Sequence, residues 1–135
     1  MQDFLHMYRA NKVARTPIWR LMTPRSYEHP STQNISLPKV LAALSDPIRL
    51  EMLRRLSDGQ EHDSITLADD LPRSTLTYHT RILREAGVTW TRGEGRMCLI
   101  SLRTRDLDAR FPGLLPALVE QAIRDASPAT PSEDS

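Results

Sequence analysis

The hydrophobic pattern of this 135-residue chain opens with two short amphipathic stretches. Residues 37–44 (LPKVLAAL) predict a first helix, because proline is tolerated in an opening helical turn. A second helix follows, capped by Ser45 or Asp46 and closed by Gly59. Its predicted inward stripe is Ile48, Met52, Leu53 and Leu56, and its predicted outward residues are Arg49, Arg54 and Arg55.

Two further helical stretches follow, and only Pro72 and Arg73 separate them. A loop, GQEHDS, precedes a short helix, ITLADDL, which Ser64 caps and Pro72 terminates. A longer helix then runs from a cap at Ser74 to a stop at Gly87. A short helix, a tight turn and a longer capped helix together predict a helix-turn-helix.

The longer helix has two faces of different chemistry. Leu76, His79, Thr80 and Leu83 share the inward face by their spacing. A second face carries Ser74, Thr77, Tyr78 and Arg81. Hydroxyls, a phenol and a guanidinium suit base edges and phosphates in a DNA major groove. This face is therefore a candidate recognition surface.

Two short strands follow this helix. Val88–Arg92 and Arg96–Leu102 are joined by residues 93–95 (GEG), and glycines in so short a connection suit a hairpin turn. A hairpin directly after a recognition helix is a β-wing. We therefore expect a mainly α fold with a small β-hairpin, that is, a winged helix-turn-helix.

Residues 106–125 predict a last helical region, which Pro112 and Gly113 divide. A wide apolar stripe runs along it, formed by Leu107, Phe111, Leu114, Leu115, Leu118, Ala122 and Ile123. Such a stripe is more often a dimer seam or a core face than the wall of a ligand cavity, although a pocket at a dimer interface would combine the two.

The pattern divides the chain into three parts. Residues 1–36 form an N-terminal arm or irregular extension, in which an overlong start at Met1 is an alternative. Residues 37–125 form the winged helix-turn-helix domain with a C-terminal dimerisation helix, and residues 126–135 form a disordered tail. The start of the chain lacks the apolar core of a secretory signal, and no run approaches the ~18 apolar residues of a membrane span.

Charge is segregated along the chain although the net charge is only +1. Residues 72–105 hold seven arginines against two glutamates (+5), and residues 1–27 hold five basic groups against one acid (+4). Residues 41–71 and 106–135 each carry −4. A basic island on the helix and wing is typical of nucleic-acid binding, whereas a scatter of solvated arginines is the alternative. The expected DNA contacts are Ser74, Thr75, Thr77, Tyr78, Arg81, Arg84, Arg92 and Arg96.

The remaining chemistry argues against catalysis. Cys98 is the single cysteine, which excludes an intramolecular disulfide. It is in phase with Ile100 and Leu102, so we interpret it as a small buried hydrophobe rather than an oxidisable sensor thiol. Neither a nucleophile–base pair with usable spacing nor a glycine-rich phosphate loop is present. We expect no enzymatic activity and no cofactor.

From His29 to about Val119 the chain resembles the ArsR/SmtB family of bacterial winged-helix repressors. ALSDPIRLEMLRRL is similar to the second-helix signature of that family, STLTYHTRILREAGV to its recognition helix, and GEGR to its wing. DLDARFPGLL and EHPSTQNISLPKVLAALSDP resemble segments of one group of members. Thr80 departs from the pattern, because many members carry a large apolar residue there.

The resemblance implies a homodimer joined through its first and last helices. It also implies a repressor that binds double-stranded operator DNA, works in the bacterial cytoplasm in association with the nucleoid, and is released by a signal such as an unidentified small-molecule inducer. The expected dimerisation residues are Leu37, Val40, Leu41, Phe111, Leu114, Leu115 and Leu118. A winged-helix module that binds proteins rather than DNA is the alternative.

Metal-sensing members of the family place paired cysteines in the third helix or histidines on the last helix. The corresponding stretch here, DSITLADDL, has no cysteine, and the last helix offers Asp106, Asp108 and Glu120 without a histidine. We therefore expect no family-type metal site. A site built from His6 or His29 stays open.

Overall fold

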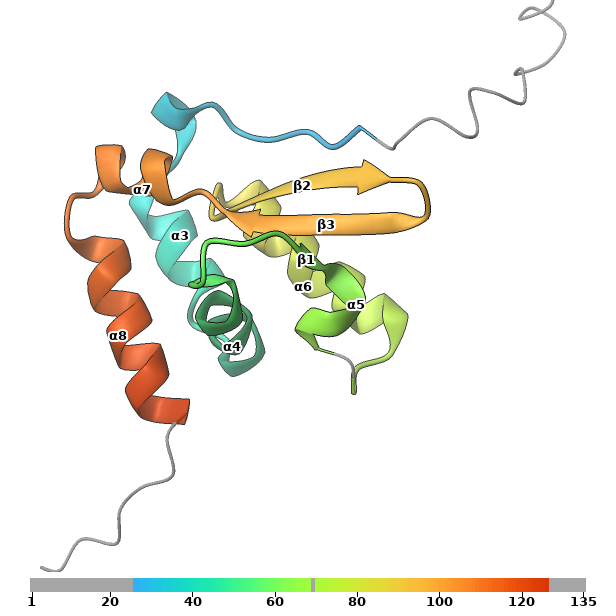
Figure 1. Ribbon diagram of the computed structural model, residues 1–135. Coiled ribbons are helices and arrows are strands. Elements are labelled where there is room, and N and C mark those ends of the chain that lie inside the picture. Colours follow the sequence, from blue (N-terminus) through green and yellow to red (C-terminus); the bar gives the residue numbers. More distant parts are fainter. Residues whose placement is uncertain (1–25, 69, 127–135) are drawn as a thin grey trace, which may run out of the picture.

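The computed structural model describes residues 26–68 and 70–126. The elements in chain order are η1 (Thr32–Asn34), α3 (Leu37–Ala43), α4 (Pro47–Leu56), β1 (His62–Asp63), α5 (Ser64–Leu67), α6 (Arg73–Glu85), β2 (Thr89–Glu94), β3 (Met97–Leu102), α7 (Thr104–Arg110) and α8 (Leu114–Ala126). The β2–β3 hairpin extends beyond the helices at one end, and α8 lies at the other (Figure 1). None of the helices described is long and apolar enough to cross a membrane.

Helix α4 lies at the centre and packs against α6, α8 and β3. Three residues of its predicted inward stripe, Met52, Leu53 and Leu56, are fully buried, whereas the fourth, Ile48, is only partly buried. Other elements contribute the rest of this core, chiefly Ile35, Val40, Leu67, Leu83, Val88, Ile100, Leu107 and Leu115. The recognition helix, the wing and the last helix therefore share one hydrophobic core.

The sheet has three antiparallel strands in the order β1-β3-β2. Strand β1 lies where the sequence predicts a loop, and it pairs His62 with Ile100. A strand of two residues is too short to show an alternating pattern of hydrophobic and polar positions. It forms only because β3 offers a free edge with which it can pair. The wing turn is also tighter than expected, because Glu94 pairs with Met97 and leaves only Gly95 and Arg96 between the strands. Gly95 has φ +60, which suits the first central position of a type II′ turn.

Two predicted helix caps are wrong. Asp63, not Ser64, caps α5, because its carboxylate accepts the Ile65 N–H at 3.1 Å. Helix α6 begins at Arg73 after Pro72, whose extended backbone ends the preceding turn, so Ser74 lies inside the first helical turn. Helix α5 is also shorter than expected.

The early end of α5 has an electrostatic reason. The backbone leaves the helix at Ala68, with φ −160 and ψ 72, after Leu67. The sequence continues with two aspartates, and carboxylates at a helix C-terminus oppose the negative end of the helix dipole. The divided last helical region, by contrast, is confirmed: α7 ends at Arg110 and α8 begins at Leu114.

Arg49, which the pattern places on the outward face of α4, is buried. Its Nε donates to the Ala43 carbonyl oxygen at 2.5 Å, and its Nη1 lies 2.9 Å from His79 Nδ1. Arginine can only donate, so the imidazole nitrogen accepts. Because Ala43 ends α3, the guanidinium satisfies a carbonyl at that helix end and joins α3, α4 and α6.

The recognition helix and the wing meet at Gly87, whose φ is +85. A Cβ at this position would lie 2.6 Å from Cγ1 of Ile35, which is itself buried. Glycine is therefore required at position 87 for two reasons: the backbone is left-handed there, and the N-terminal segment approaches it closely.

We predict that Gly87→Ala lowers the free energy of unfolding by about 3 kcal/mol, combining left-handed strain with overpacking against Ile35. Gly59→Ala is the matched control, because Gly59 has φ +78 and a Cβ added there would have nothing within 4 Å. It should cost only about 1 kcal/mol. Urea denaturation of both variants tests this, and equal losses would contradict the role given to Ile35.

Candidate nucleic-acid interface

Helix α6 presents the two faces that its sequence predicts. Leu76, His79, Thr80 and Leu83 are buried, whereas Ser74, Thr77, Tyr78 and Arg81 are exposed. Thr80 fits the interior because its hydroxyl donates to the Thr77 carbonyl at 3.2 Å. A polar residue therefore stands where an apolar one is usual without leaving an unsatisfied group.

The exposed face of α6 is preorganised by contacts between its own side chains. The Tyr78 ring is half exposed and lies edge-on to His79, with 5.2 Å between the ring centroids. The guanidinium of Arg81 lies 5.9 Å from the centre of the Tyr78 ring. Thr75, another expected contact, is only partly exposed.

A cleft of about 230 Å³ separates α6 from the wing. Four arginines line it, namely Arg73, Arg81, Arg84 and Arg96. Among the described residues none of the four takes part in an ion pair. The one acid in the lining, Asp63, already accepts the Ile65 N–H as a helix cap. The cleft is therefore a site of concentrated positive charge, suited to phosphate oxygens.

Arg73 is a member of this group that the sequence pattern did not single out. It is exposed in the first turn of α6, where backbone N–H groups and the positive end of the helix dipole also favour an anion. Arg73 belongs to the basic segment 72–105, which could have indicated it. It was not included among the expected contacts because a helix cap at Ser74 would place Arg73 in the preceding turn.

Arg92 differs from the other wing arginine. Its Nε lies 2.6 Å from Glu61 and its Nη2 3.2 Å from Glu94. The hydrogen bond from Arg92 holds the pKa of Glu61 below its usual value, and the same carboxylate raises the pKa of Arg92. Arg92 thus fastens the wing to the loop before β1, whereas Arg96 at the turn has no such partner among the described residues.

A sixth arginine of the basic island, Arg103, is buried and serves the fold. Its Nε lies 3.0 Å from the Asp106 carboxylate, its Nη1 donates to the Pro30 carbonyl at 2.8 Å, and its guanidinium stacks 3.8 Å from the centre of the Trp90 ring. Part of the basic excess is thus internal, so the local net charge overstates the surface charge.

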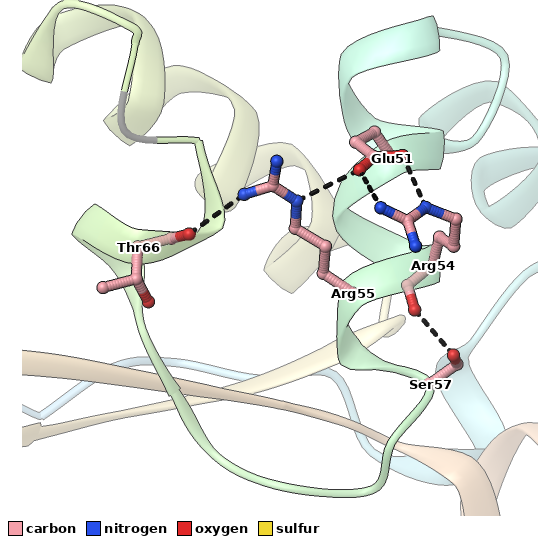
Figure 2. A network of polar contacts seen from close by, with 5 residues as sticks. All are labelled: Glu51, Arg54, Arg55, Ser57 and Thr66. Atoms are coloured by element: carbon pink, nitrogen blue, oxygen red, sulfur yellow. Dashed lines mark hydrogen bonds and ion pairs between the residues drawn. The ribbon is translucent and has the colours of Figure 1, made fainter. Parts of the chain in front are cut away.

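Helix α5 is fastened to α4 by a polar network around Glu51 (Figure 2). Glu51 binds Arg54 and Arg55, and Arg55 also donates to the Thr66 carbonyl on α5 at 3.1 Å. These two guanidinium groups lower the Glu51 pKa to about 2. The network holds α5, the first helix of the helix-turn-helix, against α4.

The expected dimerisation residues fall into three groups. Leu37 and Leu41 on α3 are exposed, at 39% and 44%. Phe111, Leu114 and Leu118 are partly buried. Val40 and Leu115 are buried in the core of their own chain, so they support α3 and α8 from inside and offer no surface to a partner.

The candidate sensor groups are dispersed in the structure. Cys98, expected to be buried, is only partly buried: it packs against the hydrophobic core and also lines the cleft between α6 and the wing. His62, expected in an exposed loop, lies in β1 with Nε2 2.9 Å from the Asp58 carboxylate. Within residues 26–68 and 70–126 no three histidine, cysteine or acidic side chains gather as metal ligands. His6 lies outside the described residues.

A recognition helix, a β-wing and an arginine-lined cleft between them define a winged helix-turn-helix protein. No family model matches the chain. YceK of Bacillus subtilis (strain 168), an uncharacterised HTH-type transcriptional regulator, is 35% identical over 83 residues, which are 59% of this chain and 83% of YceK. The chain belongs to the ArsR/SmtB-like helix-turn-helix transcriptional regulators, a family of regulators and not of enzymes.

Solved structures also match the chain. Reduced HlyU from Vibrio cholerae N16961 has the same architecture, with a TM-score of 0.53 at 26% identity, over 67% of this chain and 88% of HlyU. A possible transcriptional regulator for arsenical resistance matches with a lower TM-score of 0.48 at 26% identity, over 69% of this chain and 100% of that one.

We predict that Glu51→Gln destabilises the protein at pH 7 by at most about 1 kcal/mol, because Glu51 is one-third exposed and solvent screens its pairs. A folded-state pKa of about 2, against an ordinary value of 4.5, means that the carboxylate stabilises the fold fully above pH 4.5 and loses this effect as the pH falls to 2. The gap between wild type and variant should close over that range in urea denaturation.

Glu120→Gln is the control for this measurement. Glu120 pairs with Arg124 on α8, and both side chains are at least 60% exposed. Its removal should change stability little at any pH. A gap for Glu51→Gln that is the same at pH 7 and pH 2 would contradict the role of its charge.

Proposed function

We propose that this regulator binds operator DNA as a homodimer and represses transcription, with α6 in the major groove and the β2–β3 wing beside it. A signal then releases it from the DNA. Its place of action would be the bacterial cytoplasm, where the nucleoid lies. The family membership supports regulation of transcription, and the residues below support this mode of binding.

The observation that carries the proposal is the coincidence of two features on one surface. The exposed face of α6 holds groups that hydrogen-bond bases, and the adjoining cleft holds arginines without carboxylate partners among the described residues. Unpaired guanidinium groups repel one another, so their gathering is costly unless an anion binds there. A DNA backbone that crosses between the recognition helix and the wing supplies such anions.

The contacts divide by role. Thr77, Tyr78 and Arg81 face outward in the middle of α6, where base edges would lie. Arg73, Arg84 and Arg96 line the cleft and would contact phosphates, which position the protein without reading sequence. Ser74 and Thr75 at the start of α6 complete the surface.

A protein-binding module without DNA affinity is the competing function. It gives no reason for guanidinium groups to converge on the α6–wing cleft. It also predicts that Arg81→Glu leaves partner binding intact. We therefore favour the DNA-binding function.

The dimer is proposed from the outward apolar residues of α3 and α8. Leu37 and Leu41 are exposed on α3, and Ile123 is 48% exposed on α8. Large apolar side chains exposed on the first and last helices of the domain cost free energy in water unless a partner covers them. Leu118 on α8 is partly buried against the core of its own chain.

We predict that Arg81→Gln weakens binding to the operator by roughly 5- to 150-fold, because a guanidinium contact to a base or phosphate is worth about 1–3 kcal/mol. Tiled duplexes from the gene's own upstream region, measured by fluorescence anisotropy across salt concentrations, provide the assay. A phosphate contact would lower the salt slope by about one, and a base contact would instead relax sequence preference. Arg124→Gln on α8 is the control and should bind like wild type.

The wing supplies a second, internal comparison. Arg96→Gln should weaken binding several-fold, whereas Arg92→Gln should do less, because Glu61 and Glu94 already engage Arg92. Wild-type protein that binds none of the duplexes at low salt would overturn the proposed function. Equal effects of the two wing variants would contradict only the division between them.

We predict that Leu41→Glu converts the protein from a dimer to a monomer of 15.4 kDa, because a carboxylate cannot be buried unpaired at an apolar interface. Met97→Glu is the control, since Met97 is 46% exposed but lies on the wing. Light scattering at micromolar concentration gives the mass. A monomeric wild type would contradict the dimer.

A further inference from the structure

A groove of about 350 Å³ lies between α3 and α6, and it shares no residue with the arginine-lined cleft beside the wing. Ala42 and Ala43 of α3 and Ile82 and Ala86 of α6 give the groove an apolar lining. Its volume is near the lower end of the range for ligand pockets. The groove therefore suits the apolar body of a small organic molecule.

Arg49 reaches this groove from α4 and is only 8% exposed. Its Nε donates to the Ala43 carbonyl and its Nη1 to His79 Nδ1, which leaves Nη2 without an acceptor among the described residues. Nη2 is not enclosed, because only the Thr89 and Thr91 hydroxyls are fully enclosed without a partner in that part of the chain. The guanidinium also takes part in no ion pair there. A buried cation without a counter-charge is unfavourable, and an anion in the groove would supply that charge.

The charges of the lining favour a ligand with a single negative charge. Lys39 on α3 and Glu85 on α6 are exposed, and neither is in an ion pair with a described residue. Together with Arg49 they give the groove two positive charges and one negative charge, a net charge of +1. One carboxylate neutralises this charge and matches the paired N–H donors of a guanidinium. A phosphate monoester, with close to two negative charges, would exceed it.

The proposed dimer leaves this groove open. Lys39 is two residues from both Leu37 and Leu41, which at about 3.6 residues per turn is roughly half a turn around α3. The two exposed leucines therefore lie on the side of α3 opposite to Lys39. A partner that covers them does not have to cover the groove.

We propose that this groove is the effector site of the regulator and that it binds a small monocarboxylate. The carboxylate pairs with the guanidinium of Arg49, and the apolar body of the ligand lies over Ala42 and Ile82. The inference rests on the proposed DNA-binding function, because the signal it describes acts on the recognition helix.

The route from the groove to the recognition helix is short. A carboxylate that accepts from Nη1 and Nη2 of Arg49 together competes with His79 for Nη1. His79 then loses the donor that fixes its ring on the inward face of α6, where the ring also contacts Tyr78 of the exposed face. The ligand therefore favours a state of α6 with lower affinity for DNA.

Binding is measured first without DNA, by isothermal titration calorimetry of the full chain with butyrate, hexanoate, octanoate, benzoate and phenylacetate. At least one should bind with a Kd below about 1 mM. Its uncharged amide should bind at least about 10-fold more weakly, because it lacks the charge-assisted hydrogen bonds. Lys39→Gln should weaken binding of the carboxylate about 2- to 5-fold, whereas Arg124→Gln, which removes an exposed cation from α8, should have no effect.

Ala42→Glu tests the position of the site. Ala42 is exposed on α3, so the longer side chain is compatible with folding, while its carboxylate occupies the groove and repels the ligand. Binding should be lost. Gln33→Glu is the matched control, because Gln33 is exposed in η1 outside the groove, and it should bind like wild type. Arg49 stays in place in all these variants, because it joins three helices.

The imidazole resonances of His79 report the proposed competition directly. Saturating carboxylate should shift them in the wild-type protein and not in Ala42→Glu. The resonances of His62, which lies in β1, should stay unchanged in both proteins. A ligand that only stabilises the fold would not act on His79 in this selective way.

The effect on DNA is measured last. Saturating carboxylate should weaken operator binding by wild type about 10-fold, and saturating operator should weaken carboxylate binding by the same factor, because coupling between two sites is reciprocal. Ala42→Glu should bind the operator without responding to the carboxylate.

The outcomes separate the two proposals. Absence of binding by all five carboxylates, or binding that Ala42→Glu leaves unchanged, would overturn the site. Binding in the groove with no change in operator affinity would overturn its role as an effector site. Failure of the protein to bind any duplex, with carboxylate binding intact, would instead overturn the proposed function.

Discussion

The contact between Ile35 and Gly87 is the constraint on which the rest of this structure depends. A left-handed glycine ends the recognition helix and turns the chain into the wing, and Ile35 fills the space that a side chain there would take. The Ile35 carbonyl in turn accepts both Nε and Nη2 of Arg110 on α7. This one point therefore joins the N-terminal segment to the recognition helix, the wing and α7.

The arginines show that one residue type can stabilise the interior of a protein and also form a binding surface. Arg49 and Arg103 are buried because carbonyl oxygens, an imidazole nitrogen or a carboxylate satisfy their donors. Those around the α6–wing cleft have no carboxylate partner among the described residues and remain available to an anion. An arginine is therefore structural or available for binding according to whether hydrogen-bond acceptors of the protein surround it, and not according to how many arginines the segment contains.

One of the buried arginines also joins the two surfaces proposed for dimerisation and DNA binding. The buried link from Ala43 through Arg49 to His79 joins the helix proposed for dimerisation to the inward face of the recognition helix. The helices that carry the proposed dimer and DNA surfaces are thus linked by hydrogen bonds within one protomer.

The sequence by itself determined the order of the main helices and of the two wing strands, the inward and outward faces of α6 and the division of the last helix at Pro112 and Gly113. These features rest on local rules, namely the 3.6-residue period and the backbone preferences of glycine and proline, which need no distant partner. The family resemblance followed from the same local motifs.

Only the tertiary structure decided which polar residues are internal and where the N-terminal segment lies. Arg49 is inside because Ala43 and His79 offer acceptors from neighbouring helices, and β1 exists because β3 offers an edge. The contact of Thr91 with His29 spans 62 positions. Hydrogen bonds and close packing between remote residues leave no periodic trace in a single sequence, and this is why the interface arginines could be distinguished only once the chain was folded.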